Sequence, residues 1–160
     1  MALKLLLIRL RTKQISGSCL IRSLFLEYPM QKKNKMSRWE LLKSQLNNLE
    51  PEEFHTAVEN QSDGILIDCR KASEVAQGKI PGAINVDYLA PDFWEQIEHL
   101  DPQQTYFVYC RSGRRSIRTC TLMQNGGFSR VFNLNGGLNA WIDQFGMDSL
   151  INEDSCLDEG

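Results

Sequence analysis

The chain has 160 residues, of which 42% are hydrophobic and 24% are charged, and this length and composition suit one globular domain with a tail. The charge is unevenly placed, because residues 1–38 carry nine basic residues and one acidic residue, whereas residues 39–160 carry nine basic and nineteen acidic ones. Such an acidic body argues against a nucleic-acid surface, and five cysteines without a C-x-x-C pair indicate neither a disulfide framework nor a zinc site. A reducing compartment fits this use of cysteine.

The basic segment 1–38 is expected to lie outside the fold. Its apolar run Leu5–Ile8 is too short to cross a membrane, and Arg9 and Arg11 follow it instead of a small-residue cleavage site. Two interpretations stay open: an organelle transit peptide, or an upstream extension of a protein that starts at Met36. We favour the second, which predicts a cytoplasmic protein, whereas a transit peptide at residues 1–35 would predict a mitochondrial one.

The first half of the fold is predicted to alternate helices with short strands. Ile65–Asp68 is an uninterrupted apolar run that ends in an acid, as a strand buried on both faces requires, and Asp63-Gly64 breaks the helix before it. In chain order, we expect a short helix within residues 39–49, a short strand or turn at residues 48–54 that leads into a helix with Pro51 in its first turn, a strand at residues 65–68, a helix at residues 72–77 and a strand at residues 84–86.

The second half continues the alternation. We expect a helix at residues 91–99, a strand at residues 106–109, a helix from about residue 115 to Gly126-Gly127, a strand at residues 131–134, a helix that opens at Gly136-Gly137, and a frayed acidic tail at residues 151–160. Strands that alternate with helices on short links predict an α/β fold with a parallel sheet covered on both faces.

Cys110 is the candidate nucleophile. Four strand-forming residues run directly into it, and a short loop rich in arginine, glycine and serine follows before the next helix. A strand, a tight loop and a helix N-terminus place several backbone N–H groups around one side chain, and the helix dipole with Arg111, Arg114 and Arg115 favours the thiolate. A cysteine at the end of a buried strand is often a structural residue that packs in the apolar core. The arginine-rich loop after Cys110 has no evident packing role, which favours a catalytic role for this cysteine.

Four short motifs, in this order, resemble those of a single rhodanese domain. They are Asp68-Cys69-Arg70 with Glu74, then Gly78-Lys79-Ile80-Pro81-Gly82-Ala83-Ile84-Asn85, then Cys110-Arg111-Ser112-Gly113-Arg114-Arg115-Ser116, and finally Leu134-Asn135-Gly136-Gly137 with Trp141. The resemblance assigns residues 39–150 to one rhodanese-like domain, between the leader at 1–38 and the tail at 151–160. It implies a five-stranded parallel sheet with helices on both faces.

The resemblance also implies a function. Members of this family that are active move sulfane sulfur, from thiosulfate or a protein persulfide, to a thiophilic acceptor such as cyanide or a thiol. Cys110 then carries the persulfide, no metal or organic cofactor is needed, and the partners are the sulfur donor, the acceptor or a sulfur-relay protein, with no nucleic acid and no membrane. The substrate-binding loop maps to Arg111, Ser112, Gly113, Arg114, Arg115 and Ser116.

Other matched residues take structural roles, and one departs from the family pattern. Structural roles are implied for Asp68, Arg70, Glu74, Gly136 and Gly137. Lys79 stands where a histidine is common, which affects packing of a turn more than chemistry.

Three other functions compete with this interpretation. Cysteine phosphatases and arsenate reductases place five residues between the cysteine and the arginine that clamps the anion, whereas four separate Cys110 from Arg115. A non-catalytic binding module usually loses the cysteine, which this chain keeps. A dedicated persulfide carrier would share the loop, so the sequence does not separate it from an enzyme that uses thiosulfate.

Two further cysteines have expected positions. Cys69 directly follows a predicted parallel strand, so it should share a sheet edge with Cys110, as filler or as a partner that resolves an oxidised Cys110. Cys120 should be buried in helix packing.

Overall fold

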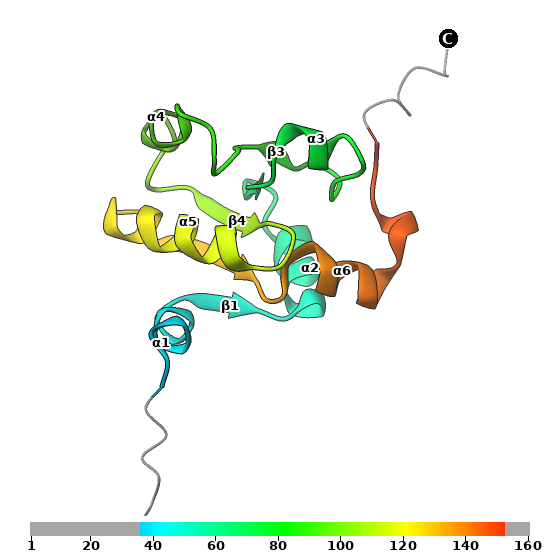
Figure 1. Cartoon of the computed structure of the whole chain (residues 1–160), viewed down its shortest axis with the longest axis horizontal. Coiled ribbons are helices and arrows are strands. Elements are labelled where there is room, and N and C mark those ends of the chain that lie inside the picture. The colour runs from blue at the N-terminus through cyan, green and yellow to red at the C-terminus, as the bar shows by residue number, and fades with distance from the viewer. Residues whose placement is uncertain (1–35, 153–160) are drawn as a thin grey trace, which may run out of the picture. The chain divides into compact units, whose positions relative to one another are not determined.

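The computed structural model describes residues 36–152, in which helices cover both faces of one sheet (Figure 1). The elements follow in the order α1 (Arg38–Ser44), β1 (Asn47–Leu49), α2 (Pro51–Asn60), β2 (Ile65–Asp68), α3 (Ala72–Val75), β3 (Ile84–Asn85), α4 (Phe93–Glu98), β4 (Thr105–Tyr109), α5 (Arg114–Asn125), β5 (Arg130–Leu134), α6 (Gly137–Phe145) and a 3₁₀ turn η1 (Met147–Ser149). This alternation of strands and helices confirms the predicted α/β class.

The sheet has five parallel strands in the order β1-β5-β4-β2-β3. Its central strand, β4, is buried along its whole length and pairs with β2 on one side and β5 on the other. The register sets Asp68 opposite Tyr109, so β2 and β4 end side by side. Ligand sites in parallel sheets form at such carboxyl ends of the strands.

Helices cover the two faces of the sheet and form two apolar cores. One core holds Tyr106, Val108 and Cys110 of the central strand and its end, packed under α1, α4 and α5. The other holds Phe107 and Tyr109, packed under α2 and α6. Alternate residues of β4 thus face opposite cores, as the two-residue period of a strand requires.

One predicted helix is shorter than expected. The leucines at helical spacing suggested a helix within residues 39–49, but α1 ends at Ser44 and Leu49 lies in β1, paired with Leu134 of β5. The Asn48 side chain donates to the carbonyl oxygens of Lys43 and Leu46, and it thereby satisfies groups at the end of the helix. The pairing of β1 with β5 and the hydrogen bonds of Asn48 therefore end the helix at Ser44, although the leucine spacing would allow a longer one.

The edges of the predicted domain also have defined structure. Helix α1 begins at Arg38, the last residue of the predicted leader, and Ser37 caps it by accepting a hydrogen bond from the Glu40 N–H at 3.2 Å. Ile151, the first residue of the predicted tail, exchanges two backbone hydrogen bonds of 2.9 Å with Lys79. The predictions for residues 1–35 and 153–160 lie outside the described residues. Within residues 36–152, no helix has the length and hydrophobicity needed to cross a membrane.

Candidate active site

Cys110 lies where the central strand ends and the loop to α5 begins. Its side chain belongs to the core under α5, and the residue is 1% exposed. The loop runs through Arg111 and Ser112 to Gly113, which caps α5 with a left-handed φ of +86°. The predicted strand, loop and helix N-terminus around Cys110 are therefore all present.

The N-terminus of α6 holds this loop in place. The backbone N–H of Leu138 donates to the Cys110 carbonyl oxygen at 2.7 Å, and that of Asn139 donates to the Arg111 carbonyl oxygen at 3.0 Å. Gly137 makes this approach possible, because a Cβ atom there would lie 2.4 Å from the Cys110 carbonyl oxygen and 2.7 Å from the Gly113 nitrogen. The structural role predicted for this glycine is thus close contact with the loop.

The same contacts turn the N–H groups of the loop away from α6. In a planar trans peptide, the C=O and the following N–H point in opposite directions, so the N–H groups of Arg111 and Ser112 face away from α6. Within residues 36–152, no backbone N–H from Arg111 to Ser116 donates a hydrogen bond to a protein acceptor. Three of these six consecutive donors lie in the loop and three in the first turn of the twelve-residue helix α5, an arrangement that can bind an anion and that we call the anion cradle.

The three loop arginines differ in what they contact. The Arg115 guanidinium donates to both carboxylate oxygens of Glu74, at 2.6 and 2.9 Å, whereas Arg111 and Arg114 are exposed and form no ion pair within residues 36–152. The hydrogen bonds from Arg115 hold the pKa of the Glu74 carboxyl down at about 2. Arg115 thus anchors α5 to α3, while the guanidinium groups of Arg111 and Arg114 are exposed to solvent.

The other predicted site residues have distinct positions. Ser112 is exposed, while Ser116 is fully buried and its hydroxyl donates to the Gly113 carbonyl oxygen at 3.2 Å. Ser116 therefore closes the first turn of α5 through its side chain, and its backbone N–H belongs to the anion cradle.

Asp68 and Arg70 form a buried ion pair that supports α3. The Arg70 guanidinium donates to the Asp68 carboxylate at 2.6 to 3.0 Å and also to the carbonyl oxygens of Glu74 and Gly78. Through the Glu74–Arg115 pair, this network reaches from the end of β2 to the first turn of α5. The predicted structural roles of Asp68, Arg70 and Glu74 correspond to these contacts.

Cys69 lies beside Cys110, as expected from the shared sheet edge. Its N–H donates to the Tyr109 carbonyl oxygen at 2.8 Å, and its side chain is buried in the same core as Cys110. Burial raises the pKa of the Cys69 thiol. Cys120 is also fully buried in this core, as predicted for a packing residue.

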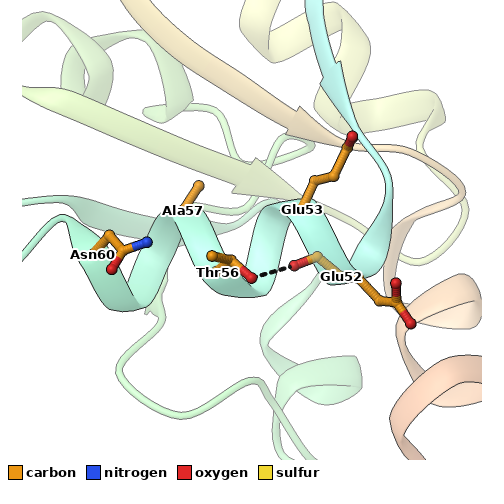
Figure 2. Close-up of a pocket in the computed structure, with 5 residues that line it drawn as sticks. All are labelled: Glu52, Glu53, Thr56, Ala57 and Asn60. Carbon is orange, nitrogen blue, oxygen red and sulfur yellow. Dashed lines mark hydrogen bonds between the residues drawn. The ribbon is translucent and has the colours of Figure 1, made fainter.

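Two surface depressions lie away from this loop. The larger, of about 500 Å³, runs along α2 and is lined by Glu52, Glu53, Thr56, Ala57 and Asn60 (Figure 2). Its one hydrogen bond between lining residues joins the Thr56 hydroxyl to the Glu52 carbonyl oxygen at 2.9 Å, an ordinary contact within a helix. The second, of about 410 Å³, lies between β3 and α4. The residues that line the two depressions do not include the cysteine loop.

Sequence reasoning missed two features of the site. The pairing of Arg115 with Glu74 joins residues far apart in the chain, and no local pattern signalled it. The donation from α6 to the loop had a sequence signal in Gly136-Gly137, since paired glycines before a helix indicate a close backbone approach.

Comparisons with known proteins agree with this geometry. The family model for the rhodanese-like domain matches residues 50–144. A sulfurtransferase of Allochromatium vinosum is 33% identical over 97 residues, which are 60% of this chain and 88% of that protein. A tRNA uridine(34) hydroxylase of Picosynechococcus is 29% identical over 115 residues, which cover 68% of this chain but 38% of the hydroxylase.

A solved structure resembles the fold. The rhodanese-like domain protein of Staphylococcus aureus superposes with a TM-score of 0.57 at 20% identity, over 68% of this chain and 99% of that one. At this level of identity the likeness concerns the fold alone.

Proposed function

Because the chain belongs to the rhodanese-like domain family, we propose that it is a sulfurtransferase that carries sulfane sulfur as a persulfide on Cys110. The donor is thiosulfate or a protein persulfide, and the acceptor is a thiol or cyanide. Relatives of differing activity share this domain, so the proposal depends on the site itself.

The observation that carries the proposal is the row of open N–H groups from Arg111 to Ser116. The outer sulfur of a persulfide is largely anionic at neutral pH, and it needs hydrogen-bond donors that are already oriented. The contacts from α6 to the loop carbonyls fix these donors before any substrate binds, so little reorganisation is needed when the charge arrives.

The chemistry has two half-reactions. The Cys110 thiolate attacks the outer sulfur of thiosulfate, a new S–S bond forms, and the old S–S bond breaks to release sulfite. A thiolate or cyanide then attacks the outer sulfur of the persulfide and takes it, which restores the Cys110 thiolate. The exposed Arg111 in the loop and Arg114 at the start of α5 attract the anionic donor.

The position of Arg115 argues against phosphate chemistry. A phosphatase of this loop type clamps the phosphate with a bidentate arginine, but here both ends of the Arg115 guanidinium are engaged by Glu74. The open donors around Cys110 also argue against a fold retained purely for binding. Neither observation favours an enzyme that uses thiosulfate over a dedicated persulfide carrier.

The test is to load the protein with sulfur and weigh it. After incubation with thiosulfate, the intact mass of the parent chain should rise by one sulfur atom, while Cys110→Ser should gain none, because serine is a far weaker nucleophile at neutral pH. Cys120→Ser, which changes another buried cysteine of the same core, is the matched control and should load like the parent. An equal gain in the Cys110→Ser variant would refute the proposal.

A second measurement separates the enzyme from the carrier. Turnover with thiosulfate is compared with turnover with a persulfidated donor protein, at equal concentrations of a thiol acceptor. Faster transfer from thiosulfate supports the enzyme, whereas transfer from the protein donor alone supports the carrier.

A further inference from the structure

Cys69 has no part in the proposed transfer, yet it lies beside the nucleophile. We propose that Cys69 is a resolving cysteine: when a hydroperoxide oxidises Cys110, the two residues form a reversible disulfide that protects the nucleophile from irreversible oxidation. The inference depends on the proposed function only in taking Cys110 as the reactive thiol.

The positions of the two cysteines meet the Cα spacing that a disulfide requires. Asp68 and Tyr109 are register partners on neighbouring parallel strands, and the Cys69 N–H continues the ladder to the Tyr109 carbonyl oxygen at 2.8 Å. One residue further along each strand, Cys69 and Cys110 therefore face each other across a strand spacing of about 4.8 Å. This spacing lies within the Cα separations of about 4.4–6.8 Å that a disulfide spans.

Both side chains also lie on the same face of the sheet. Ile67 and Val108, two residues earlier on the two strands, belong to the same core as Cys69 and Cys110, whereas Leu66 and Phe107 belong to the opposite core. The two thiols therefore share one side of the sheet, beneath α5.

The surroundings of the two cysteines assign them different roles. Cys69 is fully buried in the core under α5. Burial disfavours its thiolate, so a dissolved oxidant finds Cys69 unreactive. The proposed reaction requires that thiosulfate reach Cys110. Hydrogen peroxide is smaller than thiosulfate, so it can reach Cys110 as well. The oxidant thus acts on Cys110, and only an oxidised Cys110 engages Cys69.

The two steps balance with hydrogen peroxide as the oxidant. The Cys110 sulfur attacks one peroxide oxygen, so an S–O bond forms, the O–O bond breaks, and the released hydroxide takes a proton to become water. The Cys69 sulfur then attacks the Cys110 sulfur, so the S–S bond forms, the S–O bond breaks, and the thiol proton of Cys69 leaves with the hydroxide as a second water. The two thiols supply both electrons. An added dithiol then reduces the disulfide to two thiols and is itself oxidised to a disulfide.

The test treats the full chain with hydrogen peroxide and maps its disulfides by mass spectrometry of unreduced peptides. We expect a peptide pair that links Cys69 to Cys110, and full recovery of sulfur transfer after a dithiol is added. A link from Cys110 to Cys120 or to another chain would overturn the proposal. So would a parent chain in which peroxide leaves Cys110 as sulfinic or sulfonic acid with no link to Cys69.

Two substitutions sharpen the test. Cys69→Ser is nearly isosteric but cannot form the disulfide. Its recovery after peroxide and dithiol should be about tenfold lower than that of the parent, with Cys110 overoxidised. Cys120→Ser is the matched control and should recover like the parent. Equal recovery in Cys69→Ser would refute the resolving role.

The disulfide map and the sulfur-loading assay test the resolving role separately from protein folding and from the proposed function. If Cys69→Ser does not fold, as judged by a thermal melt, the disulfide map of the parent chain still decides. Sulfur loading of the untreated protein tests the proposed function, so that function and the resolving role can fail separately.

Discussion

The backbone N–H of Leu138 donates a hydrogen bond of 2.7 Å to the carbonyl oxygen of Cys110. The loop that holds the candidate nucleophile is thus positioned by the start of the last long helix, and not by its own sequence alone. Because the contact fixes the carbonyl, it also fixes the direction of the N–H groups that follow it. The orientation of the anion cradle therefore depends on how closely α6 approaches.

Gly137→Ala should damage both stability and sulfur transfer. The new Cβ would lie 2.4 Å from the Cys110 carbonyl oxygen, and alanine at a φ of +65° is itself strained. We expect a loss of about 2–4 kcal/mol in the free energy of unfolding, measured by urea denaturation. Sulfur transfer should also fall in the fraction that stays folded, because the loop must move.

Gly146→Ala is the matched control for backbone strain. Gly146 has a φ of +83°, but a Cβ there would meet nothing within 4 Å. Its ψ of 167° places it in a backbone region that is almost restricted to glycine, so this variant should lose about 1–3 kcal/mol of stability and keep the sulfur-transfer rate of the parent. If both variants lose activity equally, the close approach of α6 is not what positions the loop.

Much of the fold was predictable because the signals were local. The apolar run at residues 65–68 predicted β2, and the strand-forming residues before Cys110 predicted the central strand β4. The motifs around them identified the family. The end of α1 at Ser44 was not predictable, because the pairing of β1 with β5 decides it. Tertiary pairing overrides local spacing at such short elements.

The positions of the site cysteines could be predicted from the sequence, but the contacts of the loop arginines could not. The sequence placed Cys110 at a loop between strand and helix, and it placed Cys69 on the same sheet edge. It grouped Arg111, Arg114 and Arg115 together as one source of positive charge. The structure separates them, because Arg115 pairs with Glu74 across the gap to α3. A contact between distant segments leaves no periodic trace in the sequence.

Glu74→Gln should weaken the acid sensitivity of the fold. The pKa of Glu74 falls from 4.5 to about 2 in the folded chain, so the ionised carboxylate stabilises the fold above pH 4.5, and this stabilisation is lost as the pH falls toward 2. Allowing for partial solvent screening, we expect a contribution of about 1–2 kcal/mol at neutral pH. The measurement is urea denaturation of the parent and the variant at pH 6 and pH 3.

The stability gap between the parent and Glu74→Gln should be largest at pH 6 and narrow at pH 3. Glu98→Gln changes an exposed carboxylate of α4 that forms no ion pair within residues 36–152, and it should match the parent at both pH values. A gap for Glu74→Gln that does not depend on pH would show that the ion pair contributes little.

Removal of residues 1–35 should leave the domain folded and active. The five strands and both described cores are built from residues that follow Met36, and the four family motifs all lie beyond it. A chain that begins at Met36 should show the melting temperature and thiosulfate turnover of the full chain. A large loss of either would mean that the leader packs on the domain.

The length of the loop should decide between sulfur and phosphate chemistry. Inserting one glycine after Gly113 lengthens the cradle toward that of a phosphatase, while the Arg115–Glu74 pair holds α5 in place. The N–H groups would then no longer converge on the sulfur anion, and thiosulfate turnover should fall about 100-fold or more. The measurement is a steady-state assay with thiosulfate and cyanide.

The matched control inserts one glycine after Gly127, in the turn between α5 and β5, where a Cβ at Gly127 would meet nothing within 4 Å. This control should keep the turnover of the parent, since its extra residue lies at the far end of α5. The variant with the longer cysteine loop should hydrolyse an aryl phosphate weakly at best, because Glu74 still occupies Arg115, and the parent should not hydrolyse it. A parent chain that cleaves aryl phosphates readily and ignores thiosulfate would show that the cradle is built for phosphate.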